Sequence, residues 1–242
     1  MLVSPLSMSN VANFVHDTTP QCVLFDMDGT LLDLAFDNYI WMQLVPKLWA
    51  KQNQCDIATA KQRLYQFYLD NQGHLHWYSS QFWQKQLGID VLALQYAHRH
   101  LIRARPYCFE LLEQLQQRQI ECWLVTNADQ ATLTLKLENV ALRPYFKHIV
   151  SSESLGAAKE QQEFWHALQQ RHDFDPRQSV FIDDNYDVLA SAKQFGIRQL
   201  ISIAQPDSSE PQAVAQRLMK DEFIHLDQLT DLLDLIHLHS IF

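Results

Sequence analysis

Short apolar runs alternate with helically patterned segments along most of the chain. The runs are typical of buried strands and lie at residues 22–25, 122–125, 149–150, 180–182 and 199–203. The segments between the later runs repeat apolar residues at helical spacing and predict helices over residues 107–118, 130–138, 160–171 and 186–195. Strands that alternate with helices require right-handed crossovers and a parallel sheet covered on both faces. The predicted fold class is therefore α/β, a Rossmann-like doubly wound parallel sheet.

The segment from residue 34 to residue 104 follows a different pattern. It has no second apolar run of the strand type, and its apolar residues recur at helical spacing, with Gly73 and Gly88 as breaks. This indicates a small helical domain inserted after the first strand. The predicted division is an N-terminal lead-in over residues 1–20, a core made of residues 21–33 and 105–242, and the helical insertion. Residues 227–239 predict a final helix.

Composition narrows the possible partners and compartments. Hydrophobic residues make up 47% and charged residues 19% of the 242 residues, which is ordinary for a soluble globular protein. The formal net charge of -9 argues against a nucleic-acid partner, and no stretch is apolar enough to span a bilayer. The four cysteines form no CxxC pair, and the chain begins without a signal-peptide pattern. We expect reduced thiols, a cytoplasmic protein without membrane partners, and a monomer or dimer.

Polar side chains follow the predicted strands at the points where the strands end. In open parallel sheets, ligands bind beyond the carboxyl ends of the strands, so these clusters should converge at one edge. They are Asp26 to Thr30, Thr126 and Asn127, Ser151 to Ser154 with Lys159, and Asp183 to Asn185.

The carboxylates of this edge predict a metal site. Asp26 and Asp28 are separated by two positions, so in an extended chain both side chains leave the same face. Asp183 and Asp184 should arrive beside them. Carboxylates this close repel one another and stay ionised around a hard cation, and oxygen-only ligands suit Mg²⁺. The predicted metal ligands are these four residues.

The same residues predict phosphoryl transfer, which needs positioning and neutralisation of spread negative charge. Asp26 is the predicted nucleophile, and Asp28 the predicted general acid and base. Thr126, Asn127 and Lys159 are predicted to bind the phosphate. Other interpretations stay open: Thr126 and Asn127 as helix caps, Lys159 as a surface lysine, and Asp184 as a helix-start carboxylate.

Four ordered motifs resemble the signatures of the haloacid dehalogenase-like hydrolases. These are DMDGTLLD (26–33), VTNAD (125–129), Lys159 and FIDDNYDVLASAKQFGI (181–197). The resemblance implies that residues 34–104 form the family's small helical cap, which closes over the site. Two positions depart from the family pattern: Glu160 stands where many relatives have Pro, and Ile182 where many have Gly. Lys136 and Lys147 are therefore alternatives for the third-motif lysine, and Asp187 fits a supporting position.

Within this family, the segments DMDGTLLDLAFDNYIW, HWY, FW and EFWHAL resemble the bacterial GMP/IMP nucleotidase branch. The resemblance implies a small phosphate monoester as substrate, specifically a purine 5′-nucleotide. Phe36, Asp37 and Tyr39 are candidates for contact with the leaving group. The aromatic side chains Trp77, Tyr78, Phe82 and Trp83 either stack on a base or form the cap core.

Other functions remain alternatives at this point. A sugar-phosphate phosphatase or a phosphomutase would use the same fold and carboxylates. A haloacid dehalogenase is disfavoured because it needs no acid/base carboxylate at the position of Asp28. A catalytically silent protein that binds a nucleotide or a partner is the alternative from another class.

Overall fold

A computed structural model describes residues 20–211, 220 and 222–237. Its centre is a six-stranded sheet in the order β3-β2-β1-β4-β5-β6, in which every neighbouring pair is parallel. The strands are β1 (Cys22–Phe25), β2 (Glu121–Thr126), β3 (His148–Ser151), β4 (Ser179–Ile182), β5 (Gln199–Ile203) and β6 (Ile224–Leu226). The chain proceeds outward from β1 in both directions, so the sheet is doubly wound. This confirms the predicted α/β fold class.

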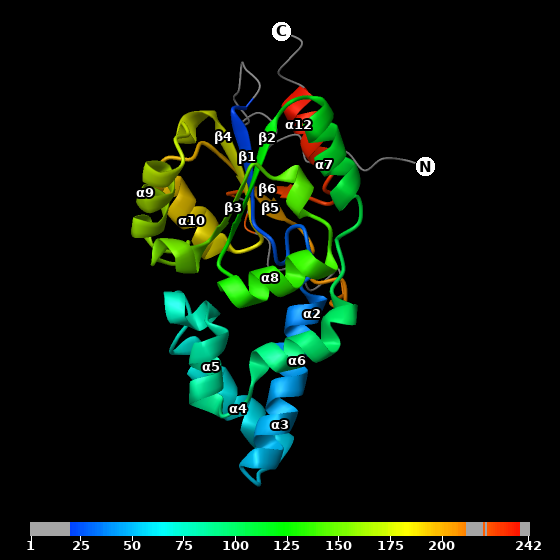
Figure 1. The fold of residues 1–242 in the computed structure, drawn as a ribbon, viewed down its shortest axis with the longest axis vertical. Helices are drawn as coiled ribbons and strands as arrows, with labels where there is room; N and C mark the ends of the chain where they lie inside the picture. The colour runs from blue at the N-terminus through cyan, green and yellow to red at the C-terminus, as the bar shows by residue number, and fades with distance from the viewer. Residues whose placement is uncertain (1–19, 212–219, 221, 238–242) are drawn as a thin grey trace.

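Helices cover both faces of this sheet (Figure 1). Side chains of successive strand residues point to opposite faces, and β1 shows the result. Val23 and Phe25 pack in the buried cluster that contains Leu111 and Leu232, whereas Cys22 and Leu24 pack with Phe164 and Val188 on the other face. The helices of the sheet-bearing part are α7 (Cys108–Gln117), α8 (Gln130–Asn139), α9 (Gln162–Arg171), α10 (Tyr186–Phe195) and α12 (Asp231–His237).

Residues 34–104, all of which the structure describes, form helices and contribute no strand to the sheet. They form α2 (Ala35–Asn38), a π-helical turn η1 (Tyr39–Leu44), α3 (Val45–Gln52), α4 (Ile57–Leu69), η2 (Leu75–Tyr78), α5 (Ser80–Leu87), α6 (Val91–His98) and η3 (Arg99–Leu101). Figure 1 shows these helices beyond one end of the sheet, with α8 between them and the strands. Trp83, which is 1% exposed, lies at the centre of an aromatic cluster in this segment. It packs edge-on against Trp41, Phe67, Tyr68 and Trp77.

The two chain crossings between the helical segment and the sheet lie side by side. The backbone N–H of Asp33 donates to the carbonyl of Arg103, and that of Arg105 donates to the carbonyl of Leu31. This pairing matches a two-strand linker between two units. The division at residues 33/34 and 104/105, and the cap interpretation, stay predictions.

Several elements differ from the sequence-based expectation. Strand β6 was not predicted, because its three residues, Ile224 to Leu226, give too short a pattern. The final helix begins at Asp231 instead of residue 227, since the Asp231 carboxylate accepts the N–H of Gln228 and fixes a turn there. The expected end of that helix at residue 239, and the lead-in over residues 1–19, lie outside the described residues. None of the described helices has the length and apolar character needed to cross a membrane.

Candidate active site

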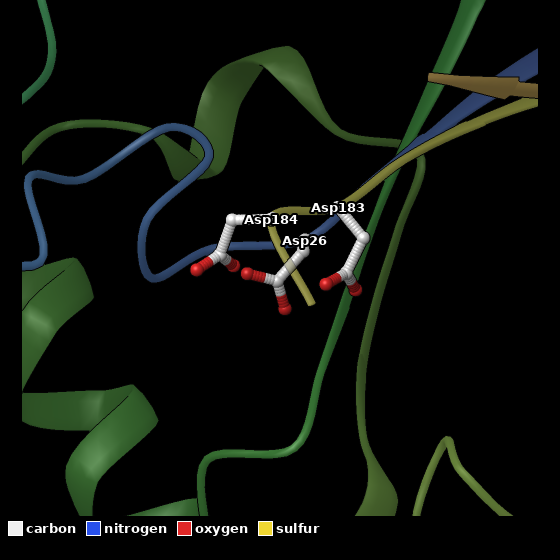
Figure 2. Close-up of side chains that lie close together, drawn as sticks. All are labelled: Asp26, Asp183 and Asp184. Atoms are coloured by element: carbon white, nitrogen blue, oxygen red, sulfur yellow. The ribbon is translucent and has the colours of Figure 1, made fainter. Parts of the chain in front are cut away.

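Three aspartates meet at the carboxyl ends of the two central strands. Asp26 follows β1, and Asp183 and Asp184 follow β4, which pairs with β1 so that Phe25 lies opposite Ile182. One carboxylate oxygen from each aspartate lies within 4.8 Å of the other two. Figure 2 shows the three carboxylates directed toward the same space. Neighbouring parallel strands of equal register therefore bring together residues that lie more than 150 positions apart.

The electrostatics of this group call for a cation. Burial raises the pKa of Asp26 to about 8, against the lowering effect of Lys159 and with a further rise from Asp183. Burial also raises the pKa of Asp184 well above its ordinary value, and the neighbouring Asp183 adds to the rise. A carboxylate that is costly to ionise becomes a good ligand once a cation compensates its charge. An oxygen-only donor set of this kind fits Mg²⁺.

Lys159 is the lysine that contacts this group. Its ammonium group forms ion pairs with Asp26 and with Asp183, the latter at 2.7 Å, and donates to the carbonyl of Val125 at 3.2 Å. Burial alone would lower the pKa of Lys159, but the two carboxylates outweigh that effect and raise it. By contrast, the Lys147 side chain is 53% exposed and pairs with Glu121. Of the alternatives for the third-motif lysine, Lys147 is thus remote from the aspartates.

Thr126 and Asn127 lie at the end of β2 beside the aspartates. The Thr126 hydroxyl accepts the N–H of Ala128 at 3.0 Å. The side-chain oxygen Oδ1 of Asn127 accepts the backbone N–H of Lys159 at 2.9 Å, and the side-chain nitrogen of Asn127 donates to Glu160 at 3.0 Å. Both residues are nearly fully buried. They occupy the cavity wall next to Asp26, and their phosphate-binding roles stay predictions.

Asp28 is paired differently from the other aspartates. The ammonium group of Lys136, from α8, lies 2.7 Å from Asp28 Oδ1 and 2.8 Å from both carboxylate oxygens of Asp37. Burial raises the pKa of Asp37 to about 6, although Lys136 opposes the rise. The structure does not bring the Asp28 carboxylate into the three-aspartate group, so its role as a metal ligand stays a prediction. Lys136 serves this second cluster, not the one around Asp26.

Gly29 allows Asp184 to approach the first motif. Its φ of +85° lies in the left-handed region, and a Cβ atom placed there would stand 2.5 Å from the Asp184 carboxylate carbon. Any larger residue would therefore displace Asp184 in addition to straining the backbone. This contact explains the glycine of the Asp-Gly-Thr pattern.

A cavity of about 310 Å³ opens above the aspartates and extends toward the helical segment. Of the predicted substrate contacts, Asp37 lines the cavity, whereas Phe36 and Tyr39 do not. Phe36 is buried in the core and Tyr39 packs against His98. The cavity is lined on the sheet side by Asp26, Asp28, Thr126, Asn127, Lys136, Lys159, Asp183 and Asp184, and on the helical side by Asn38, Trp41, Tyr68, Gln72, Trp77, Tyr78, Ser80, Trp83 and Gln95, among others.

Comparison with known proteins decides the family. The model of the haloacid dehalogenase-like hydrolase family matches residues 20–196, which include the first three motifs, the fourth motif up to Gly196, and the three aspartates. The chain belongs to the haloacid dehalogenase-like hydrolases. It is 38% identical over 197 residues to the GMP/IMP nucleotidase YrfG of Escherichia coli, covering 81% of this chain and 88% of that protein, and equally to the YrfG of Shigella flexneri. The predicted family and the predicted enzyme class, a phosphoric monoester hydrolase, are confirmed.

Solved structures support the same fold at lower identity. A haloacid dehalogenase-like phosphatase from Thermococcus onnurineus superimposes with a TM-score of 0.72 at 20% identity, covering 90% of this chain and 98% of that one. The hydrolase YfnB from Bacillus subtilis, which was solved with bound magnesium, gives a TM-score of 0.63 at 19% identity, covering 91% of this chain and 100% of that one. These likenesses establish the fold of the hydrolase over nearly its whole length.

Sequence reasoning missed the contacts between the helical segment and the sheet-bearing part. The N–H and hydroxyl of Ser80 both donate to the Asp129 carboxylate, at 2.6 and 2.5 Å, while the other oxygen of Asp129 caps α8. The Thr132 hydroxyl donates to Gln95 at 3.2 Å. Asp129 is readable in sequence as a helix cap three residues before Thr132, but its second partner, 49 residues away in sequence, has no local signal.

Proposed function

We propose that this hydrolase is a Mg²⁺-dependent phosphatase that cleaves small phosphate monoesters through an aspartyl-phosphate on Asp26. The observation that carries the proposal is the three-aspartate group with the Lys159 ammonium against it. Asp26, Asp183 and Asp184 would hold the ion. Bound there, Mg²⁺ supplies charge neutralisation and a template for the phosphate oxygens.

The chemistry assigned to the side chains runs in two steps. In the first, a carboxylate oxygen of Asp26 attacks phosphorus, the bond to the leaving oxygen breaks, and Asp28 gives its proton to that oxygen. In the second, Asp28 takes a proton from water, the water oxygen attacks phosphorus, and the bond between phosphorus and Asp26 breaks. Inorganic phosphate and the free carboxylate of Asp26 are regenerated. Lys159 and Asn127 stabilise the charge on the phosphate oxygens throughout.

Residues 34–104 are proposed to act as the cap of this site. The cavity is bounded on one side by the strand tips and on the other by helical residues such as Trp41 and Trp77. Such closure excludes water and strengthens the electrostatic interactions inside. The polar contacts of Ser80 and Gln95 with α8 supply a docking surface for the closed position.

A purine 5′-nucleotide such as GMP or IMP is the proposed substrate. The YrfG relatives are named for these nucleotides. The cavity volume of about 310 Å³ reaches the range of small-molecule sites, and its helical side combines aromatic rings with amide groups. Trp41, Trp77 and Tyr78 offer faces for a base, and Asn38 and Gln72 offer hydrogen-bonding groups.

Phosphate release from a substrate panel tests this function. The panel holds IMP, GMP, AMP, glucose 6-phosphate and p-nitrophenyl phosphate, each with Mg²⁺ and with Asp26→Asn as the control. We expect release from several esters, the highest kcat/KM for IMP and GMP, and no release by Asp26→Asn. A preference for the hexose phosphate would overturn the nucleotide proposal alone. Absence of release from every ester would overturn the phosphatase proposal.

A further inference from the structure

A chain of hydrogen bonds joins the helical segment to the predicted phosphate-binding residues. The hydroxyl of Tyr78 donates to Glu160 Oε1, and the side-chain amide of Asn127 donates to Glu160 Oε2 at 3.0 Å. The backbone N–H of Lys159 then donates to the side-chain oxygen Oδ1 of Asn127 at 2.9 Å. Glu160 therefore stands between one residue of the helical segment and two residues of the site.

This series of hydrogen bonds joins three parts of the fold. Tyr78 ends η2, Asn127 follows β2, and Glu160 lies in the turn before α9. Burial raises the pKa of Tyr78, and the neighbouring Glu160 raises it further. The phenol consequently stays protonated and remains a donor to the carboxylate. The contact can exist only while η2 lies against the turn that carries Lys159 and Glu160.

We propose that Glu160 is a positioning residue that couples closure of the cap to the orientation of the Asn127 side chain. The proposal rests on the proposed function. An asparagine amide can turn over and exchange its oxygen and nitrogen, which would aim an acceptor at the phosphate. With its side-chain oxygen held by the Lys159 N–H and its amide nitrogen held by Glu160, Asn127 would present an amide hydrogen and not its oxygen to the phosphate.

Departure of the cap would weaken this arrangement. Glu160 would lose the Tyr78 donor, and its carboxylate would be free to turn away from Asn127. The donor geometry at Asn127 is therefore best maintained in the closed state, in which water is also excluded.

A double-mutant cycle tests the coupling directly. The variants are Tyr78→Phe, which keeps the ring and removes only the hydroxyl, Glu160→Ala, and the two combined. We expect kcat for p-nitrophenyl phosphate and IMP to fall about tenfold in each single variant, with KM changed by less than about threefold. The combined variant should lose no more than Glu160→Ala alone, because both changes break one chain. Glu160→Gln, which keeps one acceptor oxygen, should retain more activity than Glu160→Ala.

Tyr65→Phe is the matched control, since Tyr65 lies on α4 with 60% of its surface exposed. It should match wild type in every measurement. Multiplicative losses in the combined variant would overturn the coupling, because independent sites add in free energy. Single variants with wild-type kcat would overturn it as well.

Hydrogen exchange supplies a readout that needs no substrate. Amides of residues 75–79 should exchange faster in Glu160→Ala and in Tyr78→Phe than in wild type, and at the wild-type rate in Tyr65→Phe. Equal exchange rates in wild type and all three variants would overturn the proposed link between Tyr78 and Glu160, even if the enzyme releases phosphate at the normal rate. If no ester is hydrolysed but exchange changes as expected, the contact between cap and Glu160 stands and the proposed function fails.

Discussion

The ammonium group of Lys136 lies 2.7 Å from the carboxylate of Asp28 and also holds Asp37. Lys136 is 1% exposed, so this ion pair is shielded from water on the lysine side. It joins α8 of the sheet-bearing part to the proposed acid/base and to the first helix of the proposed cap. A buried cation with two carboxylate partners holds both in place, because a carboxylate that moves away gives up an ion pair that is shielded from water.

Lys136→Met should therefore cost both stability and activity. Removing one partner of a buried ion pair leaves uncompensated charge, and we expect a loss of about 3–5 kcal/mol in the free energy of unfolding. Under conditions where the variant is folded, kcat should fall at least about tenfold because Asp28 loses its fixed position. Urea unfolding and steady-state kinetics measure the two effects.

The same substitution at an exposed ion pair is the control for this prediction. Lys147 pairs with Glu121 on the surface, and Lys147→Met should change the free energy of unfolding by less than about 1 kcal/mol. Equal stability of the Lys136 and Lys147 variants would contradict the structural role assigned to Lys136.

The requirement for Mg²⁺ should rise as the pH falls. Burial raises the pKa of Asp26 to about 8 and raises that of Asp184 well above its ordinary value in the metal-free site. Mg²⁺ binds the ionised carboxylates, so protons compete with it at low pH. We expect the Mg²⁺ concentration for half-maximal activity to increase as the pH is lowered from 8.5 to 6, by about tenfold per pH unit below the pKa for each proton that the ion displaces. A pH-independent Mg²⁺ requirement over this range would contradict the assignment of these residues as ligands.

Gly29→Ala should weaken Mg²⁺ binding through Asp184. The added Cβ would stand 2.5 Å from the Asp184 carboxylate carbon, so the carboxylate must move. Gly73 is the matched control, because it has a similar φ of +80° and nothing within 4 Å of its Cβ position. Both alanine variants should lose about 1–2 kcal/mol of stability from backbone strain. Only Gly29→Ala should require more Mg²⁺ for half-maximal activity, and a Mg²⁺ titration that is unchanged in that variant would show that Asp184 is not a ligand.

Asp129→Ala should destabilise the hydrolase more than loss of a helix cap alone. Asp129 caps α8 and accepts two hydrogen bonds from Ser80, so its loss also leaves buried donors without partners. We expect a loss of roughly 2–4 kcal/mol in the free energy of unfolding. The control is Asp56→Ala, which removes the exposed cap of α4. Similar losses in both variants would mean that the contact with Ser80 contributes nothing measurable.

Strands β1 to β5 and the convergence of Asp26, Asp183 and Asp184 could be predicted because apolar runs mark each strand and its end. A buried apolar run ends at Asp26 and another at Asp183, and parallel pairing brings the two ends together. The first, second and fourth motifs lie at the ends of β1, β2 and β4, and Lys159 comes after β3. The rule that ligands bind beyond the carboxyl ends of parallel strands therefore applies to all of them. Helix α10 and strand β5 were predicted with the bounds that the structure shows.

The contacts that could not be predicted join residues far apart in sequence, in segments whose hydrophobic patterns say nothing about each other. Lys136 was weighed in sequence as an alternative to Lys159, but nothing in its surroundings indicates that it pairs with Asp28 across the fold. Glu160 stood out as a departure from the family pattern without a reason for the carboxylate. The reason is Tyr78, 82 positions away in sequence, and it depends on how the helical segment packs against the turn before α9. The packing of the helical segment against the sheet-bearing part leaves no periodic hydrophobic pattern in the sequence of either one.

Direct detection of a phosphoryl group on Asp26 is the most incisive measurement for this account. The enzyme with Mg²⁺ is mixed with excess IMP or p-nitrophenyl phosphate and quenched in acid within milliseconds, and its peptides are analysed by mass spectrometry, with Asp26→Asn as the control. We expect the added mass of one phosphoryl group on the peptide that contains Asp26, and on no peptide of the Asp26→Asn variant. Phosphate release by an Asp26→Asn variant at the wild-type rate, or a phosphoryl group on another residue, would contradict it.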